Sequence, residues 1–328
     1  MTDKEQYREL CANESSIPIY SRDWWLDCVC GENKWDVLLY FSDRGSDAIE
    51  AAFPFYVPYK KGIMMPAFTQ TMGIWFNPIF EKENYSKNLL RKQNICDQLI
   101  RRLPEHIYFI QNFHHLFTDW LPFYWKGYAQ TTRYTYILPD IRNIGEIEKN
   151  RNSNIRRNID KALTKYQMEI KTHLPADLFL EINAKTYERQ KEKAYQPKML
   201  RRLIETAYSR NQGNTWGAFD KDGQLHAAVF VVWQENCAYY ITGGSDQIGR
   251  ASGAHLLALW EAIREVSNIS ASFDFEGSMI PGVERVFRSF GAIQKPYFTI
   301  SKGKRPRVRE IVEIIRIFFQ YSSNEAKN

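Results

Sequence analysis

The sequence has no long hydrophobic run. No window in its 328 residues approaches the ~18 consecutive apolar residues that a membrane-spanning helix needs. The first ten residues, MTDKEQYREL, carry charges where a secretory signal peptide would be apolar. We therefore expect a cytoplasmic protein with neither a membrane span nor a signal peptide.

Cysteine is scarce and poorly arranged for cross-linking or metal binding. The five cysteines are odd in number and scattered, and the one close pair is Cys28-Val-Cys30. No second pair and no histidine pair follows at the spacing of a zinc site. The adjacent His114 and His115 have no nucleophile motif such as GxSxG near them. These absences predict free, buried thiols, structural histidines and no bound metal, in a reducing compartment.

The chain does contain many aromatic and charged residues. Aromatic residues make up 15% of the sequence, hydrophobic residues 44% and charged residues 25%, which is typical of a soluble globular protein. Basic residues behind the net charge of +6 gather in residues 151–165 and in the C-terminal tail from residue 305. This pattern favours a phosphate-bearing or otherwise anionic partner over a general nucleic-acid partner, and we expect no DNA binding.

The second half of the chain alternates strand-like and helix-like patterns. The expected strands are 168–172, 215–220, 225–234, 237–242, 272–276 and 296–301, and the expected helices are 176–189, 198–211, 254–266 and one from 281. The pair Gly243-Gly244 is expected to end the run of three consecutive strands. Strands that alternate with helices predict parallel pairing, and consecutive strands predict an antiparallel meander. The predicted fold class is therefore α/β with a mixed sheet.

The first half shows a fainter version of the same pattern. The expected strands are 35–41, 48–56, 106–111 and 133–138, and the expected helices are 85–102 and 119–125. The segment FYWKGYAQTTRYT from Phe123 matches FRSFGAIQKPYFT from Phe287 at four positions, each pair 164 residues apart (Gly127 and Gly291, for example). This repeat indicates an ancient duplication with its boundary near residues 139–148. We predict an N-terminal domain of residues 1–143 and a C-terminal domain of residues 144–328.

Two acids precede the last predicted helix, in the stretch FDFEGSMIPGVERVFRSFGA. In an extended strand Phe273 and Phe275 share one face, and Asp274 and Glu276 share the other. Two carboxylates this close indicate either a solvated edge or a site where one of them holds a proton.

A mixed sheet of this order, built twice, resembles the FemAB-like branch of the GNAT acyltransferase superfamily. The segments that carry the resemblance are NIRRNIDKAL (154–163), RASGAHLLALWEAI (250–263) and DFEGSMIPGVERVFRSFGA (274–292). It implies two tandem GNAT-like domains with mixed parallel and antiparallel sheets flanked by helices, and transfer of an acyl or aminoacyl group to an amine. The long helical hairpin inserted in some peptidoglycan-bridge enzymes has no counterpart here, which argues against a transfer-RNA donor.

The resemblance also implies a donor site in the stretch SDQIGRASGAH. GNAT proteins cradle the coenzyme A pyrophosphate at a strand-to-helix turn, where backbone N–H groups and the helix N-terminus favour an anion. Arg250 and Gly253 fit the superfamily pattern, whereas His255 occupies a position that is normally small. We therefore expect acyl-coenzyme A as co-substrate, bound by Arg250, Ser252, Gly253 and Ala254. The alternative is a flexible turn in which Ser252 caps the helix.

The same resemblance gives the acids a role. An amine that attacks an acyl carbonyl must lose a proton to a base whose pKa lies near the working pH, and neighbouring carboxylates in an apolar cleft raise one another's pKa. We expect Glu276 to be this base or to anchor the amine, with Asp274 orienting it. Tyr240 would line the acyl channel or donate to the tetrahedral oxyanion. The alternative is that Glu276 caps the following turn or pairs with Arg285 or Arg288.

Three further residues are candidates for substrate binding. Arg157 and Lys161, followed by Lys165, recur every four residues on one helical face, which either holds a phosphate-bearing substrate or is a solvated face. Tyr297 is either a substrate contact or a core aromatic residue. The tail SKGKRPRVREIVEIIRIFF predicts a basic amphipathic helix that either rests on an anionic membrane surface or packs on the body.

We predict an N-acyltransferase that moves an acyl group from an acyl-coenzyme A thioester to an amine. The acceptor would lie in a cleft between the domains, which residues 66–78 either line or pack beneath. The resemblance implies a cell-envelope precursor, such as a peptidoglycan precursor, as this acceptor. One alternative is a peptidoglycan-bridge aminoacyltransferase whose donor is a charged transfer RNA. The other is a GNAT-like module that binds a ligand and has lost the chemistry.

Overall fold

A twelve-stranded mixed sheet forms the centre of the computed structural model, which describes residues 1–42, 48–59, 61–79, 84–189 and 196–303. The strand order is β1-β2-β3-β5-β12-β6-β11-β10-β9-β8-β7, and β4 pairs with β2. The strands are β1 (Trp35–Phe41), β2 (Ile49–Tyr59), β3 (Gly62–Met64), β4 (Trp75–Phe76), β5 (Tyr108–Phe113), β6 (Ala129–Leu138), β7 (Glu169–Thr172), β8 (Gly213–Phe219), β9 (Leu225–Trp233), β10 (Cys237–Ser245), β11 (Ser272–Asp274) and β12 (Ile293–Gly303). Within the described strands, β3–β5 and β10–β11 are parallel pairs and the other pairs are antiparallel. The predicted α/β class with a mixed sheet is confirmed.

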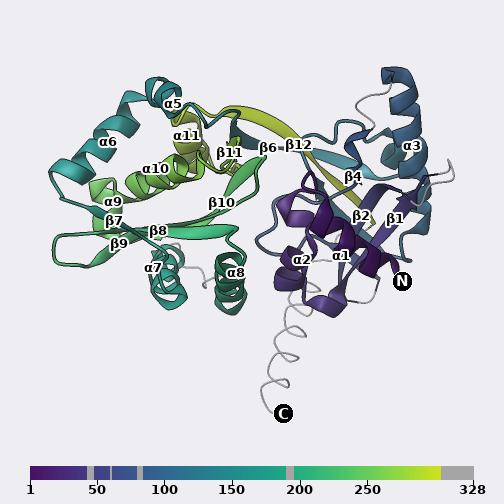
Figure 1. Cartoon of the computed structure of the whole chain (residues 1–328), viewed down its shortest axis with the longest axis horizontal. Helices are drawn as coiled ribbons and strands as arrows, with labels where there is room; N and C mark the ends of the chain where they lie inside the picture. Colours follow the sequence, from purple (N-terminus) through teal and green to yellow (C-terminus); the bar gives the residue numbers. More distant parts are fainter. Residues whose placement is uncertain (43–47, 60, 80–83, 190–195, 304–328) are drawn as a thin grey trace, which may run out of the picture.

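Helices flank both faces of the sheet (Figure 1). They are α1 (Asp3–Asn13), α2 (Asp23–Cys30), α3 (Tyr85–Arg102), α4 (Leu121–Trp125), α5 (Ile144–Asn150), α6 (Ser153–Thr164), α7 (Ala176–Arg189), α8 (Pro197–Ser209), α9 (Gln247–Ser252), α10 (Ala254–Val266) and α11 (Pro281–Ser289). In the second half, α7 and α8 lie on one face of β8–β10, and α6, α10 and α11 lie on the other. The helical spacing of apolar residues in 85–102, 176–189 and 254–266 predicted these helices correctly.

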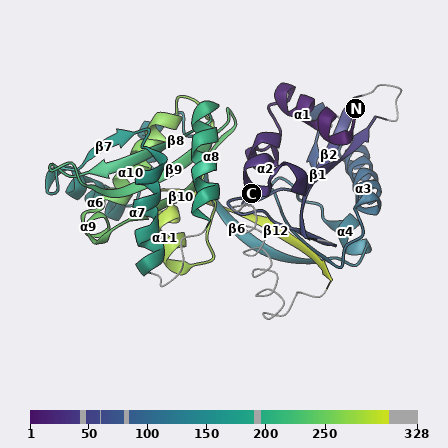
Figure 2. The same cartoon turned by 90° about the horizontal axis from the view of Figure 1, so that it is seen from below.

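The two halves exchange their last strands. β12, from the second half, lies between β5 and β6, and β6 lies between β12 and β11. Figure 2 shows these two long strands side by side between the halves. The pairing of these strands follows the sequence repeat. Phe109 on β5 pairs with Lys302 on β12. The residue 164 positions after Phe109 is Phe273, the residue 164 positions before Lys302 is Leu138, and these two also pair with each other. This register supports the predicted duplication.

One hydrophobic core joins the halves on the face that carries α7 and α8. Trp25 and Cys28 of α2 belong to the same buried cluster as Leu203 and Ala207 of α8. Arg202 of α8 also donates to the carbonyl oxygen of Cys28. The boundary predicted between residues 143 and 144 falls at the start of α5, within a continuous sheet, and the two-domain division stays a prediction.

Two local predictions are wrong. The pair Gly243-Gly244 does not end the sheet, because β10 continues to Ser245. A Cβ at Gly244 would clash with the carbonyl oxygen of Ile182, so this glycine lets α7 pack directly on β10. The strand expected at 272–276 ends at Asp274.

The basic amphipathic helix predicted for the C-terminal tail lies outside the described residues. In the part of the chain that the structure describes, no helix is long and apolar enough to cross a membrane. All five cysteines are free and four of them are buried, as the scattered spacing predicted.

Candidate active site

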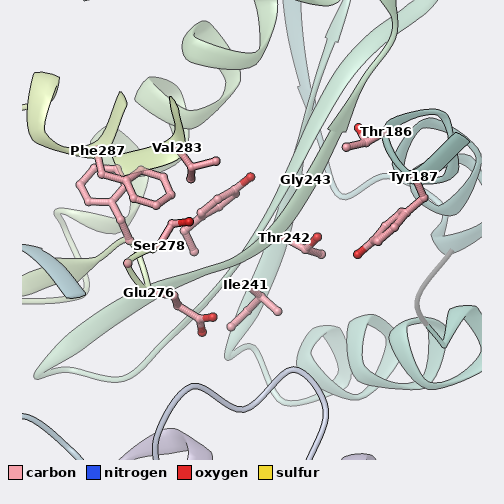
Figure 3. A pocket seen from close by; sticks show the side chains of 12 residues that line it. Thr186, Tyr187, Ile241, Thr242, Gly243, Glu276, Ser278, Val283 and Phe287 are labelled. Carbon is pink, nitrogen blue, oxygen red and sulfur yellow. The ribbon is translucent and has the colours of Figure 1, made fainter. Parts of the chain in front are cut away.

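A cavity opens where two parallel strands separate. β10 and β11 pair over three residues each, ending with Tyr239 opposite Asp274, and β10 shifts its register on β9 between Tyr240 and Thr242. The cavity beyond this point has a volume of about 290 Å³ and lies among α7, β10, the segment after β11, and α11 (Figure 3). Its lining residues are Thr186, Tyr187, Tyr240, Ile241, Thr242, Gly243, Phe275, Glu276, Gly277, Ser278, Val283 and Phe287.

Glu276 is the acid that faces this cavity. Its backbone has a φ of 62°, a left-handed conformation that a non-glycine residue keeps only when its neighbours hold it. Its N–H donates to Asp274 Oδ1 at 2.7 Å, and its carbonyl oxygen accepts from the side chain of Gln70. Its Oε1 is shielded from solvent and has no hydrogen-bond partner among the described residues, and Arg288 pairs with Glu284 instead. Burial raises the pKa of the Glu276 carboxyl well above its ordinary value.

Asp274 lies behind Glu276 and does not line the cavity. It is only 2% exposed, and its Oδ1 accepts from the hydroxyl of Thr135 on β6. The expectation that both acids share one face of a strand is wrong, because β11 ends at Asp274 and the positive φ of Glu276 turns the chain. Burial raises the pKa of Asp274 to about 6, although hydrogen bonds from Thr135 and from the Glu276 N–H act in the opposite direction. The raised pKa values therefore come from burial and not from repulsion between the two carboxylates.

Tyr240 and Tyr239 lie on opposite faces of β10. Tyr240 lines the cavity, with its hydroxyl oxygen 3.3 Å from His255 Nε2 and its ring edge-on to Phe287 at 6.1 Å between centroids. Burial raises the pKa of Tyr240, so its hydroxyl keeps its proton and can donate. Tyr239 instead packs against Tyr20, with ring centroids 5.0 Å apart. Of these two tyrosines, Tyr240 is the one that lies where a reacting carbonyl could meet it.

The predicted donor loop does not line the cavity. Ser252, Gly253 and Ala254 are buried at the junction of α9 and α10, and Arg250 is exposed. The Ser252 hydroxyl accepts from the Ala254 N–H at 3.2 Å, although the N-cap residue of α10 is Gly253 and not Ser252 as the alternative expected. A Cβ at Gly253 would clash with the carbonyl oxygen of Asn158, so the packing of α6 accounts for this glycine. Phosphate binding by Arg250, Ser252, Gly253 and Ala254 stays a prediction.

Of the three predicted substrate residues, Tyr297 is the one that lies near Glu276 and Asp274. Burial raises the pKa of Tyr297, and the charges of Glu276 and Asp274 add to that shift. Arg157 is exposed and Lys161 is partly buried on α6, which packs on α9 and α10, and neither residue lines the cavity. The substrate roles of these residues stay predictions.

A larger cavity, of about 950 Å³, lies between the two halves. Its walls come from residues 15–21, residues 72–78, α3, residues 114–121 and the starts of β10 and β11. The expectation that the segment 66–78 lines a cleft between the halves is therefore confirmed for residues 72–78.

The walls of this larger cavity carry positive charge and two neutral histidines. The charged lining residues are Lys92, Lys295 and Asp119, and His114 and His115 also line the cavity, with ring centroids 4.2 Å apart. Burial lowers the pKa of His114 to about 3 and that of His115 to about 4, so both rings are uncharged at neutral pH. Across the residues the structure describes, no group of three His, Cys, Asp or Glu side chains could hold a metal ion.

The sequence prediction missed the residues that tie the acids to the first half. Gln70 Nε2 donates to Thr135 Oγ1 at 3.1 Å, and Asn112 Nδ2 donates to the carbonyl oxygen of Gln70 at 2.9 Å. Thr135 is only 1% exposed although it is polar. The single signal in the sequence is a threonine inside the hydrophobic strand YTYIL, and that signal does not reveal its partner.

The comparisons agree with this geometry. Residues 149–278, which end just beyond Glu276, match the family described as acetyltransferase (GNAT) domain. No curated protein matches the chain. Among solved structures the chain is similar to FemX, with 9% sequence identity, a TM-score of 0.66, and 91% of this chain and 96% of that chain covered.

Two further solved structures share the fold. One is the C-terminal domain of a putative lysylphosphatidylglycerol synthetase from Agrobacterium fabrum, with 9% identity, a TM-score of 0.54, and 92% and 93% of the two chains covered. The other is L-PGS from Bacillus licheniformis, with 11% identity, a TM-score of 0.51, and 96% and 94% covered. The likeness to these structures shows the fold, and the match of residues 149–278 to the acetyltransferase domain family supports acyl transfer as the class of reaction. Residues 149–278 therefore match the GNAT acetyltransferase domain family, and the chain shares its overall fold with FemX.

Proposed function

We propose that this protein is an N-acyltransferase that moves an acyl group from an acyl-coenzyme A thioester to the amine of a cell-envelope precursor. The observation that carries the proposal is the Glu276 carboxyl. It faces the cavity between β10 and β11, its Oε1 has no hydrogen-bond partner among the described residues, and burial raises its pKa. A carboxyl in a cavity, with one buried oxygen that no described residue binds, has the properties expected of a base that takes a proton from a substrate.

The reaction can be written from these positions. The thioester carbonyl would lie in the cavity, and the amine nitrogen would attack its carbon to form a tetrahedral intermediate. Glu276 would take the proton that the amine loses, directly or through a water molecule. The Tyr240 hydroxyl would stabilise the oxyanion or protonate the thiolate that leaves when the C–S bond breaks. The products are an amide and the free thiol of coenzyme A.

The acceptor would occupy the larger cavity between the halves. Its wall places the amines of Lys92 and Lys295 where the anionic groups of an envelope precursor could bind. One solved structure with this fold is named as the C-terminal domain of a putative lysylphosphatidylglycerol synthetase. This acceptor is in keeping with an enzyme that works in the cytoplasm on precursors of the envelope.

Replacing Glu276→Gln tests the proposed base. We expect release of free thiol from acetyl-coenzyme A, in the presence of a panel of amines, to fall at least about 100-fold in kcat, because positioned bases contribute about 10²- to 10⁴-fold. Binding of coenzyme A should be unchanged. Glu261→Gln is the matched control, because Glu261 pairs with Arg264 on the surface of α10.

Three outcomes would contradict the proposal. Wild-type turnover by Glu276→Gln would remove this residue from the chemistry. Transfer from a charged transfer RNA, without any transfer from coenzyme A thioesters, would replace the donor. Coenzyme A binding without turnover in any wild-type assay would favour a module that binds its ligand and has lost the chemistry.

A further inference from the structure

A loop of the first half reaches the cavity of the second half. Residues 65–74 connect β3 to β4. The side-chain amide of Gln70 in this loop donates to the carbonyl oxygen of Glu276 and to Thr135 Oγ1. Thr135 in turn donates to Asp274. One glutamine of the first half therefore contacts both the backbone of Glu276 and the group that bonds Asp274.

These contacts hold Glu276 at both of its backbone polar groups. Its N–H is bound by Asp274 from the second half, and its carbonyl oxygen is bound by Gln70 from the first. The next residue, Gly277, also has a positive φ of 61°, and a Cβ there would clash with the carbonyl oxygen of Tyr134. Glu276 needs such restraints, because residues other than glycine rarely adopt a left-handed conformation.

Gln70 is itself fixed by neighbours on both sides. Asn112 Nδ2 donates to its carbonyl oxygen at 2.9 Å, and Asn112 Oδ1 accepts from the Thr299 hydroxyl at 2.8 Å. The preceding residue, Thr69, accepts at Oγ1 from Trp25 Nε1 at 3.0 Å. The amide of Gln70 is therefore presented from a rigid support, as a positioning group must be.

We propose that Gln70 is a positioning residue for the carboxylate of Glu276, so that the first half takes part in the chemistry of the second. The inference rests on the proposed function, in which Glu276 is the base. Without the amide of Gln70, the Glu276 carbonyl loses its donor and the left-handed backbone relaxes toward an extended conformation. The carboxylate then turns toward solvent and no longer meets the amine in the required direction.

The first test needs no enzymatic activity. Unfolding free energies of wild type, Glu276→Gln, Gln70→Ala and the double variant are measured by chemical denaturation at pH 5 and pH 8. In the wild-type background the effect of Glu276→Gln should depend on pH, because a buried carboxyl is being removed. In the Gln70→Ala background this pH dependence should shrink to less than half. An undiminished pH dependence would overturn the proposal.

The second test uses turnover with acetyl-coenzyme A and an amine substrate. Gln70→Ala should lower kcat about 10- to 100-fold with the donor KM within about twofold of wild type, because small misplacements of a reacting group are costly. The pH at which activity reaches half its maximum should also move down. Gln130→Ala is the matched control, because the Gln130 side chain donates to Thr132 on β6 and Gln130 is not among the residues that line either cavity. It should leave both parameters unchanged.

The two tests separate failure of this inference from failure of the proposed function. A fall in kcat with an unmoved pH profile would assign Gln70 a purely structural role and overturn the inference. Absence of turnover in the wild-type protein would count against the proposed function, and the denaturation cycle would still decide whether Gln70 positions Glu276.

Discussion

Glu276 combines two unfavourable features in one residue. Its Oε1 is buried and meets no hydrogen-bond donor in the described parts of the chain, and its backbone has a φ of 62°. Burial of an unpaired polar group costs about 1–3 kcal/mol, and a residue strained in this way costs a similar amount. Such features persist where function requires them. The energetic cost of these two features therefore favours a functional role for Glu276.

The pH dependence of stability tests this description of Glu276. A carboxyl whose pKa is raised in the folded state holds a proton that the unfolded chain releases, so stability is full below the unfolded pKa of about 4.3 and falls as the pH rises toward the folded value. Glu276→Gln should unfold with the same free energy as wild type near pH 4 and with a larger one at pH 8. Denaturation with urea at several pH values measures this difference.

A matched control for this experiment is Glu284→Gln. Hydrogen bonds from Arg288 and Tyr136 lower the pKa of Glu284, so its contribution is present above about pH 4.5 and is lost as the pH falls. The change in unfolding free energy caused by Glu284→Gln should therefore be the same at pH 6 and at pH 8. Parallel curves for wild type and Glu276→Gln over the whole range would show that Glu276 is not buried as described.

At the scale of elements, a charged cluster fixes the turn from β10 into α9. His226 on β9 bonds Asp246 through Nδ1 at 2.9 Å and Asp220 through Nε2 at 3.0 Å. Asp246 caps α9 by accepting from the Gly249 N–H at 2.8 Å, and Lys185 of α7 lies 3.9 Å from it. Because both ring nitrogens meet carboxylates, the imidazole is doubly protonated.

His226→Gln should destabilise the protein by about 2 kcal/mol at pH 6, because hydrogen bonds between charged groups are lost. Burial lowers the pKa of His226, but the bonds to Asp246 and Asp220 outweigh it and leave the pKa raised. The stabilisation is therefore full below the unfolded pKa of about 6.5 and declines as the pH rises through the folded value. Denaturation at pH 6 and pH 9 should show the loss shrinking at the higher pH. A loss that grows with pH would contradict the charged cluster.

Local sequence patterns predicted the helices and strands well, but they predicted the contacts between distant segments poorly. Apolar residues at helical spacing gave the bounds of α3, α7 and α10, because amphipathic periodicity is a property of the segment itself. The predicted alternation of side chains between the two faces of the strand failed at Glu276, because its positive φ turns the chain. The contacts of Gln70 and Thr135 join segments that are distant in sequence, and no local pattern encodes them.

At the scale of the whole molecule, strand exchange and the shared core make the halves interdependent. Residues 1–143 alone would lack β12, which pairs with β5, and residues 144–328 alone would lack β6, which pairs with β11. Each fragment would expose the edge of its sheet and part of the core that joins α2 to α8.

We therefore expect neither fragment to unfold cooperatively on its own. Expressed together, the two fragments should form a 1:1 complex with the circular dichroism spectrum of the full chain. Gel filtration and thermal unfolding of each fragment and of the mixture measure this. A monomeric fragment 144–328 with a sharp unfolding transition would show instead that the second half is an independent domain.

Binding of a thioester donor between β10 and β11 is the central claim, and thermal unfolding of the full chain with acetyl-coenzyme A tests it most directly. ATP serves as the phosphate control, and Ser278→Trp, at the lining of the cavity, blocks the proposed site. A ligand at 100 times its dissociation constant adds about 2.7 kcal/mol of stability. We expect stabilisation by acetyl-coenzyme A, little by ATP, and loss of the coenzyme effect in Ser278→Trp. Equal stabilisation by both ligands, or none by the coenzyme, would contradict a donor site in this cavity.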